Sequence, residues 1–277
     1  MFRALLLPLL FLALTLIPGA SARAASVTLW ADQGSDIVQY SYDTLNDTVT
    51  EVTRFTPPGM DISDDFTGLT YAPDRNTLFV VDGAGVPVQV SELALDGTQL
   101  NNFIPPSGSG ATVDGLAYLP GNIYGLQLAG PTILTFNPDG TGLGSLTIGP
   151  FSRGLAARDG RLFVTEFFGN QIFELSPTDG SILNTIPAPV STVNYGLAFD
   201  GTQLFLGAGN TVFRLNPDTG ELLGSAGLPL PVDALAVAEG GPVEPIPEPG
   251  SLVLLLTGLA GVMGWRSLRH DRLDHRV

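Results

Sequence analysis

The segment 196–224, GLAFDGTQLFLGAGNTVFRLNPDTGELLG, contains four short apolar runs with turn residues between them. We expect strands at 197–199, 203–206, 210–215 and 221–224. In the turn Asn216-Pro217-Asp218-Thr219-Gly220, proline presets φ and glycine accepts a positive φ, which favours a tight hairpin. The segment therefore predicts one small antiparallel sheet of four strands.

This unit is repeated along the chain. Its first element, Gly-Leu-x-x, occurs four times, and a degenerate copy follows as Ala234-Leu235-Ala236-Val237. The full copies are Gly68-Leu69-Thr70-Tyr71, Gly115-Leu116-Ala117-Tyr118, Gly154-Leu155-Ala156-Ala157 and Gly196-Leu197-Ala198-Phe199. Successive copies start 47, 39, 42 and 38 residues apart, which is typical of a four-stranded propeller blade of about 40 residues.

The ends of the repeat region complete one more blade. Residues 27–31, 37–42 and 49–55 predict three strands before the first Gly-Leu copy, and 234–238 predicts one strand after the last unit. Pairing these strands closes the ring and removes two open sheet edges. The sequence thus predicts an all-β fold, a propeller of about five four-stranded blades; six blades would need about 40 further residues.

Composition excludes several classes of function. The chain has 277 residues, 27 acidic residues against 12 basic ones, all of them arginine, and a net charge of −15, so a nucleic-acid partner is not expected. It has no cysteine, and its two histidines, His270 and His275, lie near the C-terminus. A thiolate nucleophile or a histidine base is therefore absent from the repeat region.

The N-terminus has the order of a secretory signal peptide. Arg3 precedes an apolar run from Ala4 to Ile17, Pro18-Gly19 interrupts any helix, and Ala22-Arg23-Ala24 offers a cleavage site. We expect residues 1–24 to be a signal peptide with a helical apolar segment. The expected propeller domain is then 25–240.

The C-terminus combines three features. A Pro-rich linker, 241–249, contains Pro247-Glu248-Pro249; the segment 250–265 has no charged residue; and Arg266 and Arg269 begin an arginine cluster. This order resembles the PEP-CTERM sorting signal, here over 247–272. The resemblance implies export in a Gram-negative bacterium that makes exopolysaccharide, processing by an exosortase-type enzyme, and transient inner-membrane anchoring through a hydrophobic helix at 250–265. An ordinary C-terminal membrane anchor is the alternative.

The repeat pattern Gly-Leu-Ala-x-Asp, Leu-Phe-Val-x-Asp/Glu and Ile-x-x-Leu resembles NHL, YVTN and gluconolactonase-like propellers over most of 27–240. Gluconolactonase-like propellers hold a divalent metal through Glu, Asn and Asp, and generally have six blades. That resemblance assigns those roles to Glu166, Asn194 and Asp233. Streptogramin-lyase-like propellers depend on a histidine, which nothing in this region matches.

The last position of the second strand in each blade is the first candidate site. It is occupied by Asp32, Asp82, Gln127, Glu166 and Ala208. Asp32, Asp82 and Glu166 could hold a hard cation such as Ca²⁺, which prefers oxygen ligands. Alternatively, each side chain caps the turn that follows its own strand. No other cofactor is expected.

The residues that precede the inner strands form the second candidate site, at one mouth of the channel. They are Thr67, Asp114, Arg153, Tyr195 and Asp233. Two acids and one arginine around the mouth predict either a polar ligand pocket or a charge-balanced plug.

These observations favour an exported propeller that acts as a non-catalytic binding or scaffolding module, located in the periplasm, on the outer surface or outside the cell. Exopolysaccharide or another surface protein is the expected partner. A metal-dependent lactonase or hydrolase, and a purely structural surface-coat protein, are the alternatives.

Overall fold

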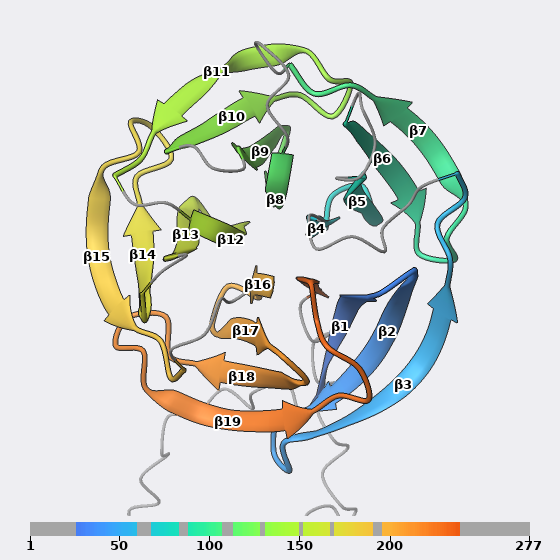
Figure 1. Ribbon diagram of the computed structural model, residues 1–277, viewed down its shortest axis with the longest axis vertical. Coiled ribbons are helices and arrows are strands. Elements are labelled where there is room, and N and C mark those ends of the chain that lie inside the picture. Colours follow the sequence, from blue (N-terminus) through green and yellow to red (C-terminus); the bar gives the residue numbers. More distant parts are fainter. Residues whose placement is uncertain are drawn as a thin grey trace, which may run out of the picture. The chain divides into compact units, whose positions relative to one another are not determined.

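A computed structural model describes residues 26–59, 68–82, 88–106, 113–127, 131–149, 152–166, 169–190 and 196–238. Every regular element within these residues is a β-strand. The strands form five four-stranded antiparallel sheets around a central axis (Figure 1). The predicted five-bladed propeller is confirmed.

Each blade is written from its inner strand to its rim strand. Blade 1 is β20 (Ala234–Ala238), β1 (Ser26–Gln33), β2 (Asp36–Asp43) and β3 (Thr48–Phe55). Blade 2 is β4 (Leu69–Ala72), β5 (Thr77–Asp82), β6 (Gln89–Ala94) and β7 (Gln99–Phe103). Blade 3 is β8 (Val113–Leu119), β9 (Asn122–Gln127), β10 (Thr132–Phe136) and β11 (Gly142–Thr147). Blade 4 is β12 (Ser152–Arg158), β13 (Arg161–Glu166), β14 (Gln171–Leu175) and β15 (Ile182–Pro187). Blade 5 is β16 (Gly196–Phe199), β17 (Leu204–Ala208), β18 (Thr211–Leu215) and β19 (Leu222–Gly227).

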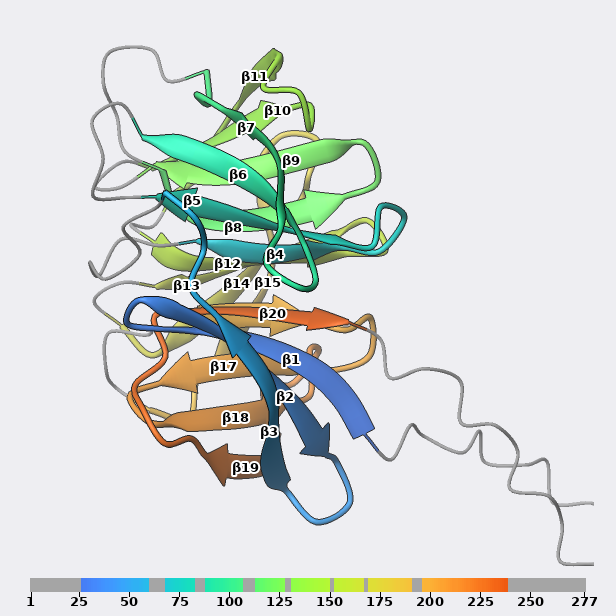
Figure 2. The same cartoon turned by 90° about the vertical axis from the view of Figure 1, so that its right-hand side faces the viewer.

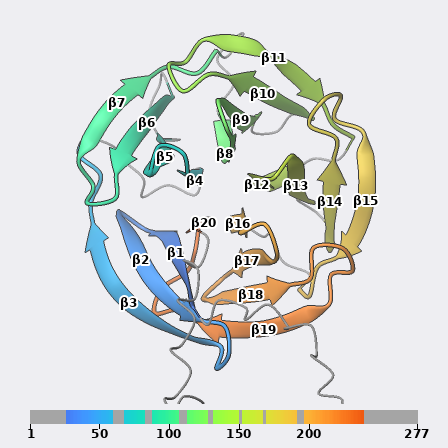
Figure 3. The ribbon, with the colours of Figure 1, turned by 180° about the vertical axis from the view of Figure 1, so that it is seen from behind.

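Blade 1 is closed by both ends of the repeat region, as the sequence predicts. Strand β20 pairs antiparallel with β1, with Trp30 opposite Ala236 and Thr28 opposite Ala238. Seen from behind, β19 of blade 5 lies next to β3 of blade 1 and completes the ring (Figure 3). Because β20 supplies the inner strand, the ring cannot open there without breaking one blade.

The hydrophobic core is divided into five clusters, and each cluster joins two neighbouring blades. One cluster, for example, joins Tyr40 and Tyr42 of blade 1 to Phe205 and Val212 of blade 5. The other four join blades 3 and 4, 2 and 3, 4 and 5, and 1 and 2. Burial between blades, rather than within one sheet, therefore holds the ring together.

The glycine of the Gly-Leu element stands where inner strands of adjacent blades come closest. A Cβ on Gly68 would lie 2.7 Å from the carbonyl oxygen of Asp114, and one on Gly115 would lie 2.6 Å from that of Arg153. Both distances are below any normal carbon–oxygen contact, so a side chain would push the blades apart. The leucine that follows is buried at each copy. The Gly-Leu element therefore recurs because the close packing of inner strands around the ring requires it.

The hairpin between the third and fourth strands of each blade packs on the preceding blade. Its positive-φ residue is glycine in four blades: Gly97, Gly140, Gly180 and Gly220, with φ of 88°, 87°, 75° and 73°. Gly97 lies against Phe55, Gly140 against Phe103 and Gly220 against Pro187. Blade 1 has Asp47 at this position, with φ of 51°. The predicted turns are confirmed, and they also join neighbouring blades.

The expected signal helix and the hydrophobic helix at 250–265 lie outside the described residues, as does the whole of the sorting signal. In the described part of the chain, no helix is long and apolar enough to cross a membrane.

Candidate functional site

The propeller has two faces, which we name by the direction of the inner strands. Inner strands begin at the entry face and end at the exit face, where hairpins connect them to the second strands in blades 2 to 5. Strand β1 starts and β20 ends at the exit face (Figure 2). The described residues of both candidate sites lie at the entry face, because second strands end where inner strands begin.

At the entry face, two of the predicted mouth residues form a buried ion pair. Arg153 Nε lies 3.4 Å from Asp114 Oδ2, and the two side chains are 7% and 2% exposed. Both residues lie at register shifts of their inner strands; such bulges re-aim a side chain. Because the two charges are opposite and in contact, they largely cancel, and the pair produces little electrostatic potential in its surroundings. This geometry supports the alternative of a charge-balanced plug.

The other mouth residues are not brought into one described pocket. The backbone N–H of Asp233 donates to the carbonyl oxygen of Asp32 at 3.1 Å. Thr67 and Tyr195 lie outside the described residues, as does Asn194. Their assignment to a ligand site stays a prediction.

The three metal candidates are placed as follows. Asp32 is buried, with 1% of its surface exposed. The carboxylate of Glu166 lies over Gly169 of its own blade, which fits the turn-capping interpretation. The side chain of Asp82 lies outside the description. Among the described residues, no three His, Cys, Asp or Glu side chains are grouped as metal ligands. A Ca²⁺ site stays a prediction.

Between the faces, the channel narrows to an apolar passage. Its lining includes one leucine from each blade, Leu69, Leu116, Leu155, Leu197 and Leu235, around about 170 Å³ of empty space. A polar ligand therefore meets an apolar barrier in the middle of the ring. Binding has to take place at one face or at the rim.

The exit face carries a shallow bowl of about 80 Å³, partly open to solvent. Its floor is formed by the last residues of the inner strands, among them Tyr71, Tyr118, Ala157 and Phe199. Pro73, Pro120, Arg158 and Asp159 come from the hairpins that follow. We name this site the exit bowl.

Aromatic side chains of the exit bowl are held by the preceding blade. Tyr71 stacks on Trp30 with ring centroids 5.2 Å apart, and Tyr118 stacks on Phe79 at 5.9 Å. Phe199 meets Phe163 edge-on at 5.0 Å. Tyr118 and Phe199 are only 3% and 4% exposed, so these contacts hold the rings between the blades and a small part of each ring lines the bowl.

Two tyrosine hydroxyls of the exit bowl are engaged by neighbouring hairpins. The Tyr71 hydroxyl donates to Asn76 Oδ1 at 3.0 Å. The Tyr118 hydroxyl donates to Asp74 Oδ2 at 3.0 Å and accepts the N–H of Gly121 at 3.2 Å. Burial, together with Asp74, raises the pKa of Tyr118 above its ordinary value. The phenol of Tyr118 is therefore neutral at physiological pH.

The described lining of the exit bowl holds few ionisable groups. Among the described residues that line it, Asp159 is the one carboxylate, beside Arg158. Hydrolysis of a glycoside normally needs two carboxylates, one acid and one base or nucleophile. Aromatic edges with a polar rim instead match the lining of many ligand sites.

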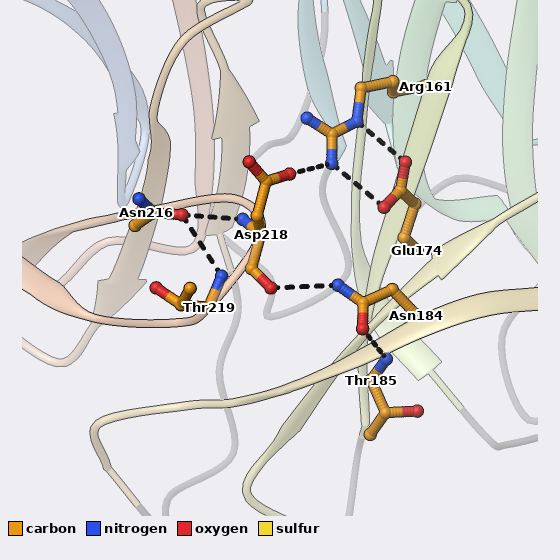
Figure 4. A network of polar contacts seen from close by, with 7 residues as sticks. All are labelled: Arg161, Glu174, Asn184, Thr185, Asn216, Asp218 and Thr219. Carbon is orange, nitrogen blue, oxygen red and sulfur yellow. Dashed lines mark hydrogen bonds and ion pairs between the residues drawn. The ribbon is translucent and has the colours of Figure 1, made fainter.

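A polar network joins blades 4 and 5 outside the exit bowl (Figure 4). Arg161 Nε lies 2.7 Å from Glu174 Oε1, and its Nη2 lies 2.8 Å from Asp218 Oδ1. Asn184 Nδ2 donates to the carbonyl oxygen of Asp218 at 3.0 Å, while Asn216 Oδ1 accepts the Asp218 N–H at 2.8 Å. The hydrogen bond to Glu174 raises the pKa of Arg161. The network closes this junction between blades.

Sequence reasoning missed the exit bowl, although a signal for it exists. The fourth position of the Gly-Leu-x-x element is aromatic in three copies: Tyr71, Tyr118 and Phe199. Aromatic residues at one repeat position, three residues after the packing glycine, lie at the same end of every inner strand. The entry-face residues were more conspicuous because they are charged.

Comparison with known proteins adds the sorting signal and the fold. Residues 245–269 match the PEP-CTERM protein-sorting motif, which confirms the predicted resemblance at the C-terminus. The motif marks an exported protein that is processed by an exosortase-type enzyme and sorted to the cell envelope or surface. No curated protein matches the sequence.

Three solved structures share the fold at low sequence identity. Glutaminyl cyclase of Myxococcus xanthus is 16% identical with a TM-score of 0.50, over 59% of this chain and 71% of that one. A chain of the nidogen/laminin complex is 13% identical with a TM-score of 0.55, over 76% and 98%. A Bacteroides caccae protein of unknown function is 12% identical with a TM-score of 0.52, over 76% and 98%. At these identities the likeness is one of fold alone.

Proposed function

We propose that this exported, exosortase-sorted propeller is a non-catalytic binding module whose exit bowl engages a partner at the cell envelope or surface, either exopolysaccharide or another surface protein. The observation that carries this proposal is the exit bowl itself: a preorganised aromatic and polar hollow with a single described carboxylate. The apolar passage and the buried Asp114–Arg153 pair below it support a ligand that binds at the face rather than within the channel.

The test fills the exit bowl without removing a contact from it. Ala157 is half-buried in the bowl lining and also packs on the core between blades 3 and 4, so Ala157→Trp adds an indole ring at the wall of the hollow and narrows it. Ala94 is also half-buried but lies outside the lining, so Ala94→Trp is the matched control. Binding of the secreted protein to purified envelope polysaccharide and to surface proteins is measured by cosedimentation. We expect Ala157→Trp to lose binding and Ala94→Trp to keep it.

The same preparation distinguishes the alternative functions. Lactone hydrolysis that appears with added divalent ions and disappears in Asp233→Asn would replace the proposal with a metal-dependent lactonase. Failure of the wild-type protein to bind any envelope component would favour the structural surface-coat protein. Binding that Ala157→Trp leaves unchanged would exclude the exit bowl as the site.

A further inference from the structure

Blades 2 and 3 repeat the residues of the Arg161 network in a different arrangement. Arg75 pairs with Glu92 through Nε and Nη2 at 2.7 and 2.8 Å, as Arg161 pairs with Glu174. Asn101 and Asn184 occupy equivalent positions on the rim strands, because each lies opposite the glutamate of its own Arg–Glu pair. The turns are Asn137-Pro138-Asp139-Gly140 and Asn216-Pro217-Asp218-Thr219-Gly220. The two junctions therefore share an Arg–Glu pair, a rim asparagine and an Asn-Pro-Asp turn, although Arg75 lies two residues before the position equivalent to that of Arg161.

The junction of blades 2 and 3 is open where that of blades 4 and 5 is closed. Arg161 and Asn184 both bind Asp218 across the blades. At the other junction, Asp139 accepts the N–H of Thr141 within its own turn at 2.8 Å. There the structure has a groove of about 370 Å³, largely open to solvent. We name it the rim groove.

Side chains of the rim groove are almost all polar. It is lined by Asp74, Arg75, Asn101, Tyr118, Gly121, Asn137, Pro138 and Asp139. Carboxylates accept hydrogen bonds, amides both donate and accept, and the guanidinium donates. This mixture complements adjacent hydroxyl groups, each of which donates one hydrogen bond and accepts others. It offers no apolar pocket of the kind that anchors a peptide side chain.

Charge further restricts the ligand. Arg75 is neutralised by the buried Glu92, so Asp74 and Asp139 leave the rim groove net negative. The chain as a whole carries a net charge of −15. Uronic acids, sulfated sugars and phosphorylated ligands would be repelled. An uncharged sugar chain meets no such penalty.

The rim groove lies next to the exit bowl, with Tyr118 between them. Tyr118 lines both hollows, and its hydroxyl bonds to Asp74, which lines the rim groove. Pro73 and Pro120 of the bowl are adjacent in sequence to Asp74 and Gly121 of the groove. Tyr118 itself is 3% exposed, so a linear polymer would cross between the hollows over the hairpin residues Pro73–Asp74 and Pro120–Gly121 and contact both sites at once, which raises its effective affinity.

From this geometry we infer that the rim groove between blades 2 and 3 binds an uncharged polysaccharide chain, which passes over the hairpin residues beside Tyr118 into the exit bowl. The inference rests on the proposed binding function and adds to it the site and the chemical class of the ligand. The repeat allows the two junctions to be compared. The junction of blades 4 and 5 is sealed by its own Arg–Asp and Asn–carbonyl contacts. At the junction of blades 2 and 3 the corresponding groups line the groove and are left for a ligand.

The experiment exploits the two matched junctions. Asn101→Ala and Asp139→Ala alter the open groove; Asn184→Ala and Asp218→Ala are the controls at the closed one. Binding of the secreted protein is measured to a neutral glucan, to a polyuronate and to a random peptide library, and thermal unfolding confirms that each variant is folded. We expect wild type to bind the glucan alone. Each groove variant should weaken binding about 3- to 10-fold, as expected for the loss of one hydrogen bond, with the controls unchanged.

The outcomes separate this inference from the proposed function. Glucan binding that the groove variants leave intact, while Ala157→Trp abolishes it, overturns the rim groove and keeps the exit bowl. Binding of polyuronate or peptide instead of glucan overturns the sugar assignment and keeps a binding function. If wild type binds none of the probes and no envelope component, both proposals fail.

Discussion

Asp47 in blade 1 and Arg214 in blade 5 are 167 residues apart, and their side chains meet at 2.8 Å where the ring closes. Asp47 occupies the hairpin position that is glycine in the other blades. Its carboxylate lies against Gly224 on β19, a position at which any side chain would collide with it. Arg214 in turn occupies the third-strand position of Glu92 and Glu174. The junction between blades 5 and 1 thus differs from the other junctions in the residues at its hairpin and third-strand positions.

The Asp47–Arg214 pair is expected to stabilise the closed ring. Burial, with the hydrogen bond to Asp47, raises the pKa of Tyr42, so its phenol stays protonated and donates to Asp47 Oδ1 at 2.9 Å. Asp47→Asn keeps the side-chain size and tolerates positive φ but removes the charge that faces a buried guanidinium. We expect a loss of about 2 kcal/mol in the free energy of unfolding, measured with urea.

Glu51→Gln is the control for this prediction. It removes a carboxylate from the exposed pair with Arg54, and exposed pairs contribute little because water screens them. A similar loss of stability in both variants would show that Asp47 has no special role in closure.

Gly115→Ala tests the close approach of the inner strands. The added methyl group would lie 2.6 Å from the carbonyl oxygen of Arg153, so the adjacent blades must separate. We expect a loss of about 1–3 kcal/mol in unfolding free energy, the usual range for overpacking. Gly227→Ala, at a site with no atom within 4 Å of the new Cβ, should be neutral or slightly stabilising. Equal melting temperatures for the two variants would contradict the packing argument.

Acid is expected to weaken the propeller through Glu92. Burial raises the pKa of this carboxyl, but hydrogen bonds from Arg75 and Thr77 outweigh burial, so its pKa lies below the ordinary value of 4.5. A lowered folded-state pKa contributes stability that is present above about pH 4.5 and is lost as the pH falls through the lowered value. The melting temperature of wild type should exceed that of Glu92→Gln at pH 7. A difference that stays constant down to pH 2 would refute this assignment.

Glu248→Ala tests the sorting motif. Glu248 lies within the matched segment 245–269, whereas Glu244 lies just before it. We expect the secreted form of Glu248→Ala to retain residues 250–277 and that of Glu244→Ala to lose them, as measured by intact-protein mass spectrometry in a strain with an active exosortase. Loss of the segment in both variants would mean that the carboxylate is not needed for processing.

Much of the fold could be predicted because its determinants are local. The spacing of Gly-Leu copies specifies blade length, and turns such as Asn216–Gly220 specify strand direction. The predicted closing strand, 234–238, coincides with β20. The role of Gly68 and Gly115 could not be predicted, because the backbone atoms they approach belong to the next blade, about 40 residues away in the sequence.

The candidate sites were predicted less completely. The charges of Asp114, Arg153 and Asp233 pointed to the entry face, where the structure pairs Asp114 with Arg153 at a bulged register. Bulges depend on strand pairing and leave no reliable mark in a single sequence. The aromatic positions Tyr71, Tyr118 and Phe199 were visible in the repeat, but only their contacts across the blades show that they line a hollow.

The sequence by itself determined the export and sorting signals, the repeat, the blade number and the closure by both ends, since these depend on residue order and short-range spacing. Only the tertiary structure decided which junctions between blades are sealed. Arg161 and Arg75 each pair with the glutamate of the third strand, but Arg161 begins β13 and reaches Asp218 of the next blade, whereas Arg75 lies two residues before β5 and the groove beside it stays open. The reason is physical: a contact between blades depends on the position of two backbones that the local sequence does not specify.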